Sequence, residues 1–254
     1  MKRLNQILII AFLILGFISC NKDDGNNEEI INQEAISAKW IVSGTSDYES
    51  FEFNTSGNYI VVEKTTTKST NNQIVLFGTY EIINNTIVLS DLGTIKVSNI
   101  GEDEINFTIT LNGNPKDELL IHATKQDIIS NSTKTKLLCR TWEVVTLGGI
   151  DIGYFVVLFS DAGTYFLETS DWNGYGTWTW CDSEESKIAF TIDNELNCDG
   201  IEIIKDLKLT SDSFIGIDTE NGVPQELILQ PVPSTKSAQL INEKIGQKIF
   251  GAIK

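Results

Sequence analysis

The chain has 254 residues, with 19 basic and 35 acidic side chains, so its formal net charge is −16. A surface this acidic repels phosphate backbones, which argues against nucleic-acid binding. Strand-favouring Val, Ile, Thr and aromatic residues are plentiful and prolines number only 4, so we expect a β-rich chain of one large or two ordinary domains.

The amino terminus has the pattern of an export signal. Lys2 and Arg3 precede an apolar run over residues 7–18. As a helix this run spans about 18 Å, short of the ~30 Å hydrocarbon core of a bilayer, so residues 1–19 are predicted to be a signal peptide. The stretch Phe17-Ile18-Ser19-Cys20 resembles the lipobox of bacterial lipoproteins, in which cleavage leaves the cysteine as the acylated first residue. An ordinary secretory signal with a chance cysteine is the alternative.

The lipobox resemblance implies a membrane anchor at Cys20, held by burial of acyl methylenes at about 0.8 kcal/mol each. Residues 20–35 are then a polar, acidic tether that we expect to be disordered. Acidic residues directly after such a cysteine resemble the signal that sends some Gram-negative lipoproteins to the cell surface. The resemblance therefore implies an outer-membrane lipoprotein of the cell envelope, facing either the periplasm or the exterior.

Five landmarks occur twice in the same order, at offsets of 98 to 109 residues. They are a tryptophan (Trp40 and Trp142), a Phe-x-x-x-Gly-x-Tyr segment (53–59 and 159–165), a Gly-Thr-aromatic segment (78–80 and 176–178), an Asn-Gly turn before Pro (112–115 and 221–224) and a following strand (118–121 and 226–229). Such recurrence indicates an internal duplication. We predict modules over 36–123 and 137–231, joined by a linker over 124–136.

Each module is predicted to hold about eight short antiparallel strands, with turn signals every 8–14 residues. In the Phe-x-x-x-Gly-x-Tyr segment, Gly57 or Gly163 takes the positive φ that closes a hairpin, while Asn54 or Asp161 caps the turn. Closing the strands into an up-and-down barrel or a flattened sandwich removes exposed edges. The predicted fold class is all-β, with two such modules in tandem.

The tryptophan, the hairpin and the Gly-Thr-(Tyr/Trp) strand together look like the lipocalin-like domains common in Gram-negative surface and periplasmic lipoproteins. The resemblance covers both copies and implies two lipocalin-like modules.

Residues 232–254 are predicted to end in a short amphipathic helix, since four isoleucines recur at every fourth position from 241 to 253. The helix either packs against the second module or lies on a lipid surface or a partner.

Three cysteines follow the anchor, in a compartment that permits disulfides. If the second module is a meander, Cys139 begins its first strand and Cys181 ends its fourth, at one end of the barrel. We therefore predict a Cys139–Cys181 disulfide. Cys198 would lie at the opposite end unless its loop folds back.

The sequence offers little that is typical of catalytic or cofactor sites. His122 is the only histidine, and no nucleophile elbow, phosphate loop or Cys-x-x-Cys pair is present. We therefore expect a non-enzymatic protein without a cofactor. The nearest approach to a metal site is a weak calcium candidate in an acidic loop, Asp193, Glu195, Asn197 and Asp199.

Aromatic residues are unequally divided, because four of the five tryptophans lie in the second module. We expect a binding site there, formed by Trp172, Tyr175, Trp180 and Tyr165, for a small apolar or carbohydrate ligand. The expected function is that of a membrane-anchored binding lipoprotein. The alternative is a structural or assembly lipoprotein that docks another envelope protein.

Overall fold

A computed structural model describes residues 31–64, 74–170, 172–192, 195–220 and 222–232. From Ile31 onwards these residues belong to one compact unit. The predicted signal peptide, Cys20 and the predicted C-terminal helix lie outside the described residues. No helix formed by the described residues is long and apolar enough to cross a membrane.

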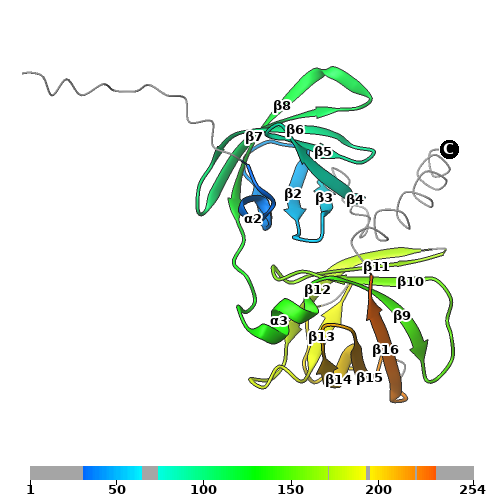
Figure 1. The fold of residues 1–254 in the computed structure, drawn as a ribbon. Coiled ribbons are helices and arrows are strands. Elements are labelled where there is room, and N and C mark those ends of the chain that lie inside the picture. The colour runs from blue at the N-terminus through cyan, green and yellow to red at the C-terminus, as the bar shows by residue number, and fades with distance from the viewer. Residues whose placement is uncertain (1–30, 65–73, 171, 193–194, 221, 233–254) are drawn as a thin grey trace, which may run out of the picture. The chain divides into compact units, whose positions relative to one another are not determined.

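The first barrel follows a short helix, α2 (Gln33–Ile36). Each of its strands pairs antiparallel with the next, and the last pairs with the first, so that the sheet closes (Figure 1). The strands are β1 (Lys39–Val42), β2 (Tyr48–Phe53), β3 (Asn58–Glu63), β4 (Ile74–Ile83), β5 (Thr86–Leu89), β6 (Gly93–Ile100), β7 (Glu104–Leu111) and β8 (Asn114–Lys125).

The second barrel repeats this plan after helix α3 (Thr133–Leu138) and is closed by the last strand pairing with the first (Figure 1). Its strands are β9 (Thr141–Leu147), β10 (Phe155–Phe159), β11 (Thr164–Thr169), β12 (Asn173–Trp180), β13 (Ile188–Thr191), β14 (Ile203–Leu209), β15 (Phe214–Asp218) and β16 (Gln225–Pro231). The predicted all-β class with two tandem up-and-down barrels is thus confirmed. The architecture is consistent with lipocalin-like modules.

The repeated tryptophans fix the two short helices to their barrels. Both indole rings are fully buried. Trp40 Nε1 donates a hydrogen bond to the Ile36 carbonyl (2.9 Å), and Trp142 Nε1 donates to the Leu138 carbonyl (2.8 Å). The carbonyls at the end of a helix lack an intrahelical partner, and the tryptophans supply one. Residues 31–35, inside the segment predicted as tether, thus belong to the described fold, and α3 begins within the predicted linker.

The repeated hairpin is closed by a side-chain cap and a glycine in each copy. Asn54 Oδ1 accepts hydrogen bonds from the backbone N–H of Ser56 and Asn58, and Gly57 has a φ of 83°. In the second copy Ser160 Oγ accepts the bond from the backbone of Thr164 (3.1 Å). The predicted capping role of Asp161 is therefore taken by Ser160, which aligns with Asn54.

The Gly-Thr-aromatic landmark holds the same hairpin from the neighbouring strand. Tyr80 Oη donates to the Asn54 carbonyl, and Trp178 Nε1 donates to the equivalent Ser160 carbonyl, both at 2.8 Å. The glycine is required by close approach: a Cβ on Gly176 would lie 1.8 Å from the Thr191 carbonyl oxygen. Phe-x-x-x-Gly-x-Tyr and Gly-Thr-aromatic are therefore two halves of one packing unit.

Each barrel has a hydrophobic core of its own, and a third cluster joins their outer surfaces. In this cluster the ring of Phe77 on β4 packs against that of Phe166 on β11, with centroids 4.6 Å apart and planes inclined at 31°. Beside it, Thr164 Oγ1 donates to Glu52 Oε2 (2.6 Å) and Lys39 Nζ lies 3.3 Å from Thr164 Oγ1. Burial raises the pKa of the Glu52 carboxyl, against the opposing effect of Lys39.

Candidate functional site

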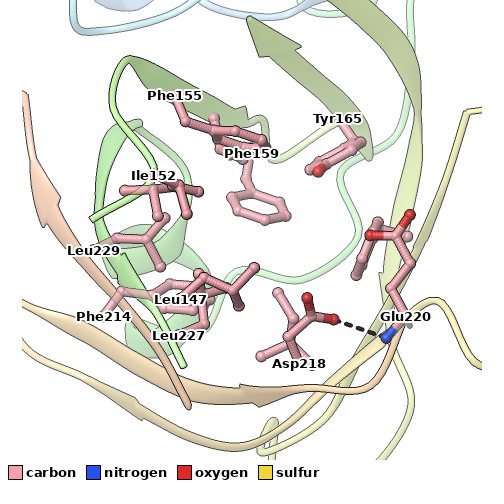
Figure 2. Close-up of a pocket in the computed structure, with 14 residues that line it drawn as sticks. Leu147, Ile152, Phe155, Phe159, Tyr165, Phe214, Asp218, Glu220, Leu227 and Leu229 are labelled. Atoms are coloured by element: carbon pink, nitrogen blue, oxygen red, sulfur yellow. Dashed lines mark hydrogen bonds between the residues drawn. The ribbon is translucent and has the colours of Figure 1, made fainter. Parts of the chain in front are cut away.

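A cavity of about 220 Å³ lies inside the second barrel (Figure 2). Most of its wall is apolar and comes from β9, β10, β15 and β16, with Val157, Phe159, Phe214, Leu227 and Leu229 among the lining residues. An apolar hollow with a few converging polar groups is the usual form of a small-molecule site.

Two phenylalanines of the first barrel have smaller counterparts in the second, and one of these counterparts, Val157, lines the cavity. Phe51 faces Trp40 across β1 and β2, and Val157 faces Trp142 in the same register across β9 and β10. Phe107 on β7 corresponds by register to Gly216 on β15. In the first barrel the rings of Phe51 and Phe107 meet edge to face, with centroids 5.1 Å apart. Val157 lines the cavity and lacks such a ring. Gly216 does not line it, and a Cβ at this glycine would lie 2.5 Å from Ile204 Cγ2.

The same register places a carboxylate where the first barrel has a hydrocarbon. Ile95 faces Ile109 across β6 and β7, whereas Ile204 faces Asp218 across β14 and β15. Ile109 is fully buried, and Asp218 is only 9% exposed. Asp218 Oδ1 accepts a hydrogen bond from the backbone N–H of Glu220 (3.0 Å), and both carboxylates line the cavity (Figure 2).

The tyrosine of the repeated hairpin also differs between the barrels, because its hydroxyl has a hydrogen-bond partner in the first barrel and lines the cavity in the second. In the first barrel Tyr59 Oη donates to the Ser90 carbonyl, and burial raises the pKa of Tyr59 to about 12. Its counterpart Tyr165 is 5% exposed and lines the cavity. Among the described residues no group accepts or donates a hydrogen bond at Tyr165 Oη, which points into the hollow near Glu220 (Figure 2). Burial, followed by the charges of Glu220, Asp218 and Glu202, raises the pKa of Tyr165, so this hydroxyl remains neutral.

The carboxylates repel one another. Burial raises the pKa of Asp218. Burial and then the negative charges of Asp218 and Glu202 raise the pKa of Glu220. Within the described part of the chain, no Lys or Arg is among the groups that shift either pKa. This side of the cavity is therefore an acidic wall without a counter-ion from the described residues.

The cavity extends toward the end of the barrel remote from α3. Its lining includes Leu147 at the end of β9, Phe155 at the start of β10 and Asp218 at the end of β15. The helix α3 precedes the start of β9 and so covers the opposite end. Phe159 and Phe214, which lie nearer that covered end, form the floor.

Of the four predicted ligand residues, only Tyr165 lines the cavity. Trp180 Nε1 donates to Thr135 Oγ1 of α3 (2.8 Å), at the covered end. The hydroxyl of Tyr175 lies 3.1 Å from Lys39 Nζ in the contact between the barrels. Trp172, in the turn between β11 and β12, is 53% exposed. The four aromatic residues thus do not form one platform.

The disulfide joins Cys181 to Cys198, with Cα atoms 5.4 Å apart, and the predicted Cys139–Cys181 pair is wrong. The meander order was right, but β13 has only four residues, and Cys198 lies beside Lys187 at the start of this strand. Lys187 Nζ donates to the Cys198 carbonyl, which holds the loop beside Cys181. Cys139 is a free thiol at the end of α3, and burial raises its pKa.

The acidic loop offers no metal site in the part that the structure describes. No three His, Cys, Asp or Glu side chains among the described residues converge as metal ligands. Asn197 Oδ1 instead accepts a hydrogen bond from the backbone of Asp199, and Glu195 and Asp199 are exposed. Asp193 lies outside the described residues. His122 is exposed on β8 and shares a hydrogen bond with Asn106.

No protein-family model matches the sequence, and no curated protein matches it.

Proposed function

We propose that the protein is a non-enzymatic binding lipoprotein of the outer membrane, anchored through Cys20, whose second barrel binds a small apolar ligand. The observation that carries the proposal is the cavity beside Val157, at a position where the first barrel has the fully buried ring of Phe51. Protein interiors are normally packed to the density of organic crystals, so a hollow of this size calls for an occupant.

The volume and the lining limit what the cavity accepts. An engineered apolar cavity of about 150 Å³ holds benzene, so about 220 Å³ accepts a single ring with two or three further atoms. A carbohydrate needs hydrogen-bond partners around its whole rim, whereas most of this wall is apolar. Of the two predicted ligand types, a small apolar molecule is therefore favoured over a carbohydrate.

Calorimetric titration of the purified full chain with propylbenzene tests the proposal. We expect saturable binding and a rise in unfolding temperature, because a ligand that binds only the folded state stabilises it. Val157→Phe restores the ring found in the first barrel and should abolish binding. Val145→Phe adds the same atoms at an exposed position of β9 and should bind like the parent. Equal binding by both variants would place the ligand outside the cavity.

The anchor is tested separately by metabolic labelling with a radioactive fatty acid. We expect label on the parent chain and none on Cys20→Ser, because the thiol is the acylation site that the lipobox implies. Label retained by Cys20→Ser would contradict the anchor while leaving the cavity untouched. The alternative, a structural or assembly lipoprotein that docks another envelope protein, stays a prediction, and the C-terminal helix that could serve such docking lies outside the described residues.

A further inference from the structure

We propose that the ligand of the second barrel is an apolar amine, with its hydrocarbon part on the floor of the cavity and its ammonium group between Asp218, Glu220 and the hydroxyl of Tyr165. This inference rests on the proposed function and specifies its ligand class.

The cavity has two unlike sides, as Figure 2 shows. Leu147, Phe159, Phe214 and Leu229 present only hydrocarbon, while the polar atoms of Tyr165, Asp218 and Glu220 lie on the other side. A ligand that satisfies both sides has an apolar body and one polar end.

The hydrogen-bonding capacity of the polar side selects the end group. An ionised carboxylate is an acceptor only, and a tyrosine hydroxyl accepts as well as donates. The described residues give Tyr165 Oη no hydrogen-bond partner, although its side chain is 5% exposed. An ammonium group offers three donors and no acceptor, which matches one oxygen each from Asp218, Glu220 and Tyr165.

Charge separates an amine from other hydrogen-bond donors. A carboxylate with little access to water is costly unless an opposite charge is close. Asp218 is 9% exposed. Among the described residues, no Lys or Arg lies close enough to lower the pKa of this carboxyl. A neutral alcohol leaves this charge uncompensated, and a carboxylate ligand adds to the repulsion. A cationic ligand supplies the missing partner.

The first barrel provides an internal comparison. Its counterpart of Asp218 is the hydrocarbon Ile109, and its counterpart of Tyr165 is Tyr59, whose hydroxyl is already bonded to the Ser90 carbonyl. The carboxylate and the unpartnered hydroxyl thus occur together beside the cavity of the second barrel, while the matching positions of the first barrel hold a hydrocarbon and a hydrogen-bonded hydroxyl.

Three probes of similar size test the inference by calorimetry on the purified full chain at neutral pH: 2-phenylethylamine, propylbenzene and phenylacetate. We expect the amine to bind about tenfold or more tightly than propylbenzene, since hydrogen bonds to charged groups are among the strongest. Phenylacetate should not bind measurably. Asp218→Asn should remove most of the amine's advantage and leave the propylbenzene affinity within about twofold, because the hydrocarbon contacts are unchanged.

Asp212→Asn, in the exposed turn between β14 and β15, is the matched control and should behave as the parent. Glu220 is exposed, so Glu220→Gln gives a second test that does not depend on how Asp218→Asn folds. Propylbenzene binding as tightly as the amine, binding of phenylacetate, or an amine preference that survives both substitutions would overturn the inference and leave the proposed function standing. Failure of all three probes would overturn both.

Discussion

Replacing Phe51 with valine should reproduce in the first barrel the hollow that the second barrel has by nature. Phe51 is fully buried, and its ring centroid lies 5.1 Å from those of Phe107 and Tyr48. Removing a buried phenylalanine to alanine costs about 3–5 kcal/mol, and valine keeps two methyl groups worth about 0.8 kcal/mol each. We therefore expect Phe51→Val to lower the free energy of unfolding by about 2–3 kcal/mol.

The reciprocal change should be far less costly. Val157→Phe adds a ring at the matching position of the second barrel, where the cavity already provides room. Filling a packed core in this way costs about 1–3 kcal/mol through strain, but here we expect a change below about 1 kcal/mol in either direction. Comparing the free energies of unfolding of the two variants thus shows which barrel has a filled interior.

Hydrogen exchange followed by mass spectrometry measures this contrast, because peptides from β2 and β7 report on the first barrel and peptides from β10 and β15 on the second. Urea unfolding of the same samples gives the overall free energy. A Val157→Phe variant as destabilised as Phe51→Val would refute the reasoning, since the space in the second barrel would then be unable to accept a ring.

Three further predictions follow from single contacts. Trp142→Phe removes the donor to the Leu138 carbonyl and should cost about 1–3 kcal/mol in urea unfolding, because a buried acceptor loses its partner. Cys198→Ser opens a disulfide with a sequence separation of 17 and should cost about 3 kcal/mol; non-reducing peptide mapping of the parent should show Cys181 joined to Cys198. Asp218 has a pKa raised by burial above its ordinary 3.8, so ionisation lowers stability as pH rises through the raised value. Asp218→Asn should therefore unfold at a higher temperature than the parent at neutral pH, and the difference should vanish as pH falls below 3.8 in calorimetric scans.

The duplication and the barrels could be predicted from the sequence because each repeated landmark residue is required by the local backbone geometry. Gly57 is needed for a positive φ, Gly176 for close approach to a carbonyl, and Trp40 for a hydrogen bond at a helix end. Such requirements depend on local geometry, so both copies keep the same residue type at the same place. The helices themselves escaped prediction because α2 and α3 have 4 and 6 residues, too few to show a helical period.

The site was harder to predict than the fold because aromatic residues serve several purposes. Trp180 forms a hydrogen bond with α3, and Tyr175 forms one with Lys39. Nothing in the sequence distinguishes such structural aromatic residues from ligand-binding ones. Asp218 could have been recognised as a site residue by comparing the two copies. The offset of 109 residues between the Asn-Gly turns already aligns it with Ile109, inside an alternating strand. A carboxylate replacing a core isoleucine is the difference between copies that marks the site.

The first barrel also supports the cavity from outside. Its cluster residues Ile60, Val62 and Phe77 pack against Leu158 of β10 and Phe166 of β11. Side chains alternate along a strand, so the inner faces of these two strands carry Val157, Phe159 and Tyr165 into the cavity. A hollow barrel has fewer internal contacts to hold its wall in place, and the outer contact offsets part of that loss. Phe77→Ala removes the ring packed against Phe166 without touching the cavity, yet we expect it to weaken binding of propylbenzene several-fold by loosening β10 and β11. Unchanged affinity in calorimetry, with exchange in β10 and β11 as slow as in the parent, would show that the second barrel holds its cavity without help from the first.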